Sequence, residues 1–193
     1  MKISKIISFI VILIFLTISF VQSIWAQQGR ATADGFVGVP WGSTREQTKS
    51  ILQKKGYRLI TNKVAFYHDA DLYSGSFAGE ASDLYFHYRG EDYFYMGSAY
   101  LVGYKGQGTD IAKVGYYNVI KVMKAKYGNC DREYSTVRGE VFGCSWGNLS
   151  TSKPPHGIVS IDVQAGAIGD PSGRASTGVH IQYVYKKFER GDI

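Results

Sequence analysis

Alternation of apolar and polar residues at every second position constrains the fold of this chain most strongly. Between residues 159 and 165, and again between residues 179 and 185, every second residue is aliphatic or aromatic. This period places the apolar side chains on one face of a strand and the polar ones on the other. From Tyr57 to Tyr104 turn residues interrupt the same period every eight to twelve positions, which indicates consecutive antiparallel strands.

Two other segments carry helix signals. Ser43 is expected to cap a first helix, with Glu46 reaching back to the cap residue and Gly56 ending the helix. A second helix is predicted after Gly108, with Thr109 as its cap and Gly128 as its end, because apolar residues recur between them at spacings of three and four.

The predicted elements combine into one α+β domain. It is a twisted antiparallel sheet with two helices packed on one face, in the order β-α-β4-α-β4. Residues 67–71 are predicted to form a turn, and residues 166–178, rich in Gly, Ser and Ala, a long mobile loop. The strands are predicted at 36–41, 58–66, 72–78, 82–88, 93–104, 131–138, 140–147, 157–165 and 178–187.

The first 26 residues have the three-part layout of a secretory signal peptide. A basic start with Lys2 and Lys5 precedes an apolar run from residue 6 to residue 20, and the small residues Ser23 and Ala26 suit cleavage. An uncleaved anchor is the alternative, because residues 6–26 are about long enough to span a bilayer. We therefore expect a signal peptide at 1–26, a flexible lead-in at 27–35 and a single domain at 36–190.

The expected location is secreted or periplasmic, with a soluble protein and no membrane span after signal cleavage. No Cys lies near the end of the signal, so the protein is not expected to be a lipoprotein. The whole chain has a formal net charge of +6, two charges of which belong to the signal. The remaining basic residues are spread almost singly rather than in a stripe, which argues against a nucleic-acid partner.

The two cysteines, Cys130 and Cys144, are predicted to form a disulfide, because an even pair in an oxidising compartment is usually bridged. A redox or metal pair is the alternative. It fits the pattern less well, since the spacing is not Cys-x-x-Cys and the local sequence offers no further metal ligands.

Several motifs resemble those of a broad group of small exported bacterial proteins of unknown function. That group has a Pro-(Trp/Phe)-Gly-Ser entry from strand to helix and a Lys-Tyr-Gly end to its second helix. The resemblance implies a fold and no catalytic residues. The matching stretches are Gly38 to Glu46, Val119 to Asn129, Trp146, Ile158 to Val163 and Ile181 to Tyr185.

Candidate catalytic chemistry is sparse. His68, Asp69 and Asp71 offer ligands for a metal ion, but Asp residues in a turn commonly cap their own backbone. No Ser or Cys stands in a nucleophile motif with a His and an acid. We therefore predict no catalytic residue, no metal site and no cofactor.

The aromatic residues of the 82–88 and 93–104 strands are the stronger indication of function. Some of them must face away from the helices, and Tyr supplies rigid contact area with a polar tip. Cross-strand aromatic pairs that merely stabilise the sheet are the alternative. With Leu84, Phe86 and Phe94 facing inward, the exposed residues are expected to be Tyr85, His87, Tyr93 and Tyr95.

The sequence thus predicts an exported, non-enzymatic binding or interaction protein of the bacterial cell envelope. Its partner would be a protein or a glycan held on the aromatic sheet face, with help from the 166–178 loop. An envelope hydrolase or metal-dependent enzyme built on His68, Asp69 and Asp71 is the alternative. The identity of the ligand and the oligomeric state are left open.

Overall fold

The computed structural model describes residues 31–64, 67–89, 93–136, 140–169 and 175–187. These residues belong to one compact unit, Ala31–Ile193. The predicted signal peptide lies outside the described residues, as do short segments between several pairs of successive strands.

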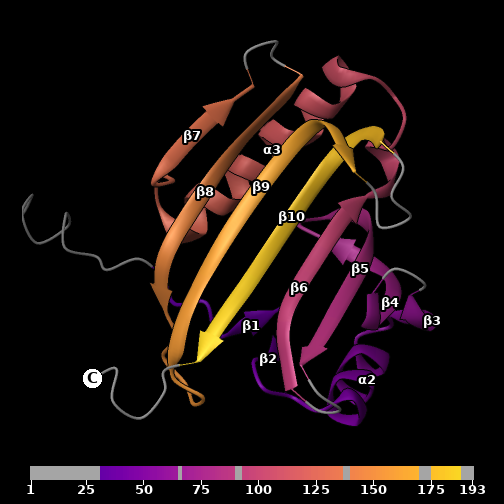
Figure 1. Cartoon of the computed structure of the whole chain (residues 1–193), viewed down its shortest axis with the longest axis vertical. Helices are drawn as coiled ribbons and strands as arrows, with labels where there is room; N and C mark the ends of the chain where they lie inside the picture. The colour runs from indigo at the N-terminus through magenta and orange to yellow at the C-terminus, as the bar shows by residue number, and fades with distance from the viewer. Residues whose placement is uncertain (1–30, 65–66, 90–92, 137–139, 170–174, 188–193) are drawn as a thin grey trace, which may run out of the picture. The chain divides into compact units, whose positions relative to one another are not determined.

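The unit is built on one antiparallel sheet of eight strands, so the predicted α+β class is confirmed (Figure 1). The strand order is β3-β4-β5-β6-β10-β9-β8-β7, and the β6–β10 pair joins the first four strands to the last four. The strands are β3 (Arg58–Val64), β4 (Tyr67–Phe77), β5 (Glu80–Arg89), β6 (Tyr93–Leu101), β7 (Arg132–Ser135), β8 (Val141–Ser150), β9 (Gly157–Gly169) and β10 (Ala175–Lys187).

Two predicted connections are strands instead. Residues 67–71 belong to β4, where they pair with β3 and β5 rather than turn. The predicted 166–178 loop is also wrong, because β9 runs to Gly169 and β10 begins at Ala175, with Gly166 opposite Gly178. Strand pairing uses backbone groups, so small side chains do not prevent two long partners from continuing their ladder.

The single strand predicted at 36–41 is a hairpin of two very short strands, β1 (Gly35–Phe36) and β2 (Val39–Pro40). Val37 and Gly38 both have positive φ angles, of 53° and 78°, as a tight two-residue turn requires. The Phe36 ring of this hairpin fills the space above Gly97 of β6, where an added Cβ would lie 2.2 Å from the ring.

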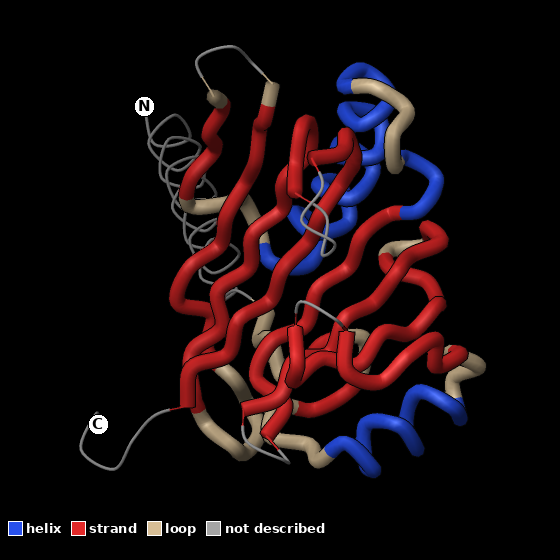
Figure 2. The backbone as a smooth tube through the Cα atoms, turned by 45° about the vertical axis from the view of Figure 1, so that its right-hand side comes forward, coloured by secondary structure: helices blue, strands red, loops and turns tan. Residues whose placement is uncertain are grey.

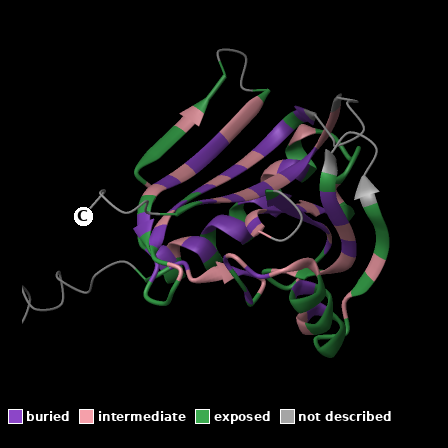
Figure 3. Cartoon of the chain, turned by 60° about the horizontal axis from the view of Figure 1, so that its bottom comes forward, coloured by how far each residue is buried: buried purple, intermediate pink, exposed green. Residues whose placement is uncertain are grey.

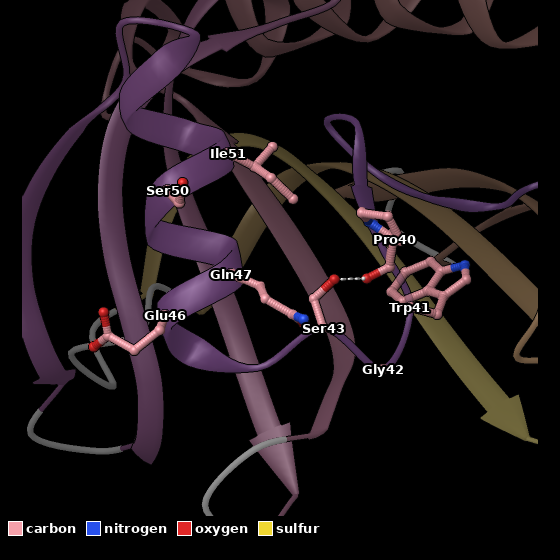
Figure 4. A pocket seen from close by; sticks show the side chains of 8 residues that line it. All are labelled: Pro40, Trp41, Gly42, Ser43, Glu46, Gln47, Ser50 and Ile51. Atoms are coloured by element: carbon pink, nitrogen blue, oxygen red, sulfur yellow. Dashed lines mark hydrogen bonds between the residues drawn. The ribbon is translucent and has the colours of Figure 1, made fainter.

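The first helix, α2 (Arg45–Lys54), starts one residue later than predicted. Its N-cap is Thr44, and Gln47 rather than Glu46 completes the capping box. The Ser43 hydroxyl donates instead to the Pro40 carbonyl over 2.8 Å (Figure 4). Gly56, with a φ of 79°, follows the helix as predicted.

The second helix, α3 (Thr109–Tyr127), ends at Gly128 as predicted, but its N-cap is Gly108, and the predicted cap Thr109 is its first helical residue. A short 3-10 helix, η1 (Val102–Tyr104), precedes it. The helix α3 contacts β9, β10 and η1, whereas α2 contacts β2 and β3 (Figure 2).

The core lies against the face of the sheet that we call the inner face. It is defined by one row of paired positions, which runs from Phe86 through Gly97, Tyr183 and Ile161 to Trp146. Buried side chains alternate with more exposed ones along most strands (Figure 3). Leu52 of α2 and the buried face of α3 belong to the same cluster: Ala112, Tyr116, Val119, Ile120, Met123 and Tyr127.

The residues before β1 are held in place from Ala33 onward, within the segment predicted as a flexible lead-in. Ala33 is buried, and its carbonyl accepts a hydrogen bond from the Trp41 indole over 2.7 Å. The Asp34 carboxylate accepts hydrogen bonds from the hydroxyl and backbone amide of Ser152. The folded unit therefore includes residues before Phe36.

Cys130 and Cys144 form a disulfide, as predicted. Cys144 lies in β8, whereas Cys130 lies two residues before β7, in the connection from α3. The bridge therefore ties this connection to β8 rather than one strand to another. Among the helices described, none is both long enough and apolar enough to cross a bilayer.

Candidate functional site

The face opposite the core, here called the outer face, carries a strip of polar and aromatic side chains across three strands. Tyr85 of β5 lies opposite Ser98 of β6, which lies opposite Gln182 of β10. In the next row Tyr100 of β6 lies opposite His180 of β10. Directly paired residues share a face, so these side chains are neighbours.

Two of the four residues predicted for a binding face lie in this strip. Tyr85 and His87 alternate with the inward-facing Leu84, Phe86 and Tyr88, yet they are only 7% and 6% exposed. The Tyr85 ring meets the Tyr100 ring edge-on at a centroid distance of 5.5 Å and lies 6.5 Å from the His87 ring. The prediction of the face agrees with the pairing, but the predicted exposure of these two residues is wrong.

The other two predicted residues lie elsewhere. A register shift between His87 and Tyr88 interrupts the pairing with β6, so the first residues of β6 do not continue this pattern. Tyr93 is half-buried, with its ring 6.2 Å from that of Tyr185, an inner-face residue. Tyr95 is also half-buried, and the Arg89 guanidinium lies 5.0 Å from its ring centroid.

Sequence reasoning missed the residues that complete the strip, because they come from strands far apart in the chain. His180 stacks on Tyr100 at a centroid distance of 4.2 Å. The alternation in residues 179–185 already places His180 and Gln182 on the polar face of their strand. Only the pairing of β6 with β10 brings them beside Tyr85 and His87.

The strip encloses a small cavity of about 70 Å³. The His180 Nε2 atom is buried and has no hydrogen-bond partner within the described part of the chain. Buried polar atoms are normally paired, so an unpaired atom beside a cavity is a place where a water molecule or a ligand group can bind. The cavity is lined by Tyr85, His87, Met96, Ser98, Tyr100, His180 and Gln182.

Both imidazoles of the strip are neutral at physiological pH. Burial lowers the pKa of His87 to about 4. Burial, and then the nearby His87, lowers the pKa of His180 to about 4. The cavity therefore presents uncharged donors and acceptors beside aromatic rings.

The residues considered for a metal site are placed differently. Asp71 is buried and forms an ion pair with Arg45 of α2 at 2.6 Å. In the sheet, Asp71 of β4 lies opposite Phe86 of β5. Asp69 is exposed, and the side chain of His68 lies outside the described residues. Where side chains are described, the one group with metal-ligand spacing contains the two disulfide cysteines and Glu133.

Two larger hollows lie away from the strip. One, of about 660 Å³, lies between the loop at Pro40–Ser43 and the first turns of α2, with Glu46 as its only charged lining residue (Figure 4). The other, of about 780 Å³, borders the β1–β2 hairpin and α3.

No protein-family model, curated protein or solved structure matches the chain.

Proposed function

We propose that this protein is an exported, non-enzymatic binding protein of the bacterial cell envelope that engages a glycan through the outer face. The observation that carries the proposal is the orphan His180 Nε2 atom beside the cavity between β5, β6 and β10. A ligand hydroxyl can donate to or accept from a neutral imidazole, which satisfies this atom.

The chemistry of the strip favours an uncharged polar ligand over a charged one. Tyr100, Gln182 and Ser98 supply hydroxyl and amide groups, and both imidazoles are neutral. The cavity of about 70 Å³ admits only one or two hydroxyl groups, so the rest of the ligand would lie across the strip. Sugars combine hydroxyl groups with apolar ring faces that pack on aromatic side chains.

The arrangement of the helices supports the same face. We propose that both helices cover the inner face, which leaves the outer face open. The Arg45 guanidinium of α2 lies 4.5 Å from the Tyr88 ring centroid, and the Tyr183 hydroxyl of β10 meets Met123 of α3 at 3.4 Å. The Cys130–Cys144 bridge supports export, since disulfides persist mainly in oxidising compartments.

A binding assay with a panel of neutral oligosaccharides tests the proposal. We expect a saturable titration that moves the imidazole NMR signals of His180 and His87. The variant His180→Phe keeps the stacked ring and loses both nitrogens, so affinity should fall about tenfold or more, as expected for one lost hydrogen bond. Release of new reducing ends by the wild-type protein would instead favour the hydrolase built on His68, Asp69 and Asp71.

A matched control is available at His156, which is exposed in the connection between β8 and β9. His156→Phe makes the same chemical change outside the strip and should leave binding unchanged. Equal affinity for the two variants, or capture of an envelope protein that His180→Phe does not disturb, would overturn the glycan proposal.

A further inference from the structure

The groove of about 780 Å³ lies on the core side of the molecule, away from the outer face. Its walls are the β1–β2 hairpin, the turn between β4 and β5, the second half of α3 and residues 153–154. Its volume falls within the range of roughly 300–1,000 Å³ that is typical of small-molecule sites. The groove is thus large enough for a ligand and independent of the outer-face strip.

The floor of the groove is aromatic, and the hydroxyl groups of Tyr183 and Tyr57 have partners within the protein. Phe77 packs against Tyr183 at a centroid distance of 6.1 Å, and Tyr183 packs against Tyr127 at 6.4 Å. The Tyr183 hydroxyl meets the Met123 sulfur at 3.4 Å, and the Tyr57 hydroxyl donates to the Ser76 carbonyl over 3.3 Å. The Tyr127 and Tyr183 rings are themselves buried, so the accessible aromatic surface of the groove comes from the partly buried Phe77 and Tyr57, which suit an apolar group.

The rim of the groove is cationic. Lys55, Lys126 and Lys153 line it, and none of them pairs with a carboxylate within the described part of the chain. Lys55 donates to the Val37 carbonyl over 3.2 Å, and the Lys126 ammonium lies 4.9 Å from the Tyr127 ring centroid. These two contacts hold two of the ammonium groups beside the aromatic floor.

The single acidic residue of the lining, Asp34, does not neutralise this rim. Its carboxylate accepts hydrogen bonds from the Ser152 hydroxyl and from the backbone amides of Ser152 and Lys153. It is therefore committed to holding the 152–153 segment. Three ammonium groups face one committed carboxylate, so the groove favours an anion.

We propose that this groove binds a monoacyl amphipathic anion, a molecule with one acyl chain and a negatively charged head. The acyl chain would lie on Phe77 and Tyr57, above the buried Tyr127 and Tyr183, and the head would meet the lysine rim. An exposed side chain extends the apolar surface, since Val122 of α3 lines the groove and is 46% exposed. An acidic peptide fits less well, because the engaged floor hydroxyls leave it few hydrogen-bond partners.

Titration of the purified protein with dansyl-labelled undecanoic acid tests this proposal. We expect saturable one-to-one binding that laurate displaces and that weakens as the salt concentration rises. Methyl laurate, which lacks the charge, and inorganic phosphate, which lacks the chain, should displace the probe at least tenfold less effectively. Equal displacement by the methyl ester would reduce the groove to an unspecific apolar patch and overturn the proposal.

Matched pairs of variants on α3 assign the binding to the groove. Lys126→Glu should weaken binding about tenfold or more, whereas Lys121→Glu, on the same helix but outside the lining, should not. Val122→Asp should act like Lys126→Glu, and Val114→Asp, at a residue that is 54% exposed outside the groove, should be silent. Equal losses within either pair, with unchanged thermal unfolding, would contradict the assignment.

Discussion

At the scale of single residues, Ser43 and Thr44 show how neighbouring hydroxyls take different roles. The pattern of Ser or Thr followed three residues later by Glu or Gln fits two registers here, from Ser43 to Glu46 and from Thr44 to Gln47. The Ser43 hydroxyl donates a hydrogen bond to the Pro40 carbonyl, and Thr44 is the N-cap of α2. The Thr44 hydroxyl accepts a hydrogen bond from the backbone amide of Gln47 over 3.2 Å. The side-chain oxygen of Gln47 accepts one from the backbone amide of Thr44 over 2.9 Å.

Thr44→Ala should therefore lower the free energy of unfolding by about 1 kcal/mol, because it leaves amides of the first turn unpaired. Thr44→Ser keeps the cap oxygen and should cost much less. Urea denaturation followed by far-UV circular dichroism measures both. In the same assay Gln47→Ala should lower the free energy of unfolding more than Glu46→Ala does. The reverse order would indicate that Ser43, paired with Glu46, caps the helix.

At the scale of elements, the disulfide connects parts of the fold that secondary structure holds only weakly. The strand β7 is four residues long and lies at the edge of the sheet. Glu133 of β7 lies opposite Cys144, and Lys124 of α3 meets the Glu133 carboxylate at 2.7 Å on the surface. Surface ion pairs contribute little to stability. The bridge adds a covalent link to the hydrogen bonds that join this connection to β8, which the Asp131 amide donates to the Ser145 carbonyl and the Trp146 indole to the Gly128 carbonyl.

The double variant Cys130→Ser/Cys144→Ser should lose about 3 kcal/mol of stability, the chain-entropy value for a loop closed by residues 14 apart. Replacing both cysteines avoids a free thiol. Denaturant midpoints of the oxidised wild type, the reduced wild type and the variant provide the measurement, and the last two should agree. Two reactive thiols in protein taken from its native compartment would contradict the bridge.

At the scale of the whole molecule, the pairing of β6 with β10 brings His180 close to His87, two titratable groups from distant parts of the chain that line one cavity. His87 and His180 both have a pKa of about 4, below the ordinary value of 6.5, because burial disfavours their charged forms. Between pH 6.5 and 4 the unfolded chain therefore binds more protons at these sites than the folded protein does.

Stability should accordingly be highest above pH 6.5 and fall as the pH drops toward 4. For each imidazole, every unit by which the pKa in the folded protein lies below the pKa in the unfolded chain changes the free energy of unfolding by about 1.4 kcal/mol. The two imidazoles together therefore account for a change of several kcal/mol. Asp83 opposes this trend, because burial raises its pKa. Denaturation midpoints of the wild type and of His87→Gln/His180→Gln across this range test the effect. A slope that the double variant retains in full would exclude the imidazoles as its source.

Local features of the chain determined much of the secondary structure. The alternation in residues 159–165 and 179–185, the period of α3 and the stops at Gly56 and Gly128 each depend on neighbours a few residues away. The disulfide was also predictable, since the chain has two cysteines and each has one possible partner. In the candidate site, the alternation with Leu84 and Phe86 along the 82–88 strand placed Tyr85 and His87 on the face opposite the core.

Tertiary structure decided what depends on residues far apart in the chain. The joining of β6 to β10 brings His180 and Gln182 to Tyr85 and His87, and it buries residues that the alternation alone predicts to be exposed. The long β9–β10 ladder overrides the loop character of its Gly and Ser residues. The groove with the lysine rim is likewise formed by the β1–β2 hairpin, α3 and the turn between β4 and β5. No local pattern in the sequence predicts that these segments lie close together. Local backbone preferences are properties of short segments, whereas strand partners and cavities depend on how the whole chain packs.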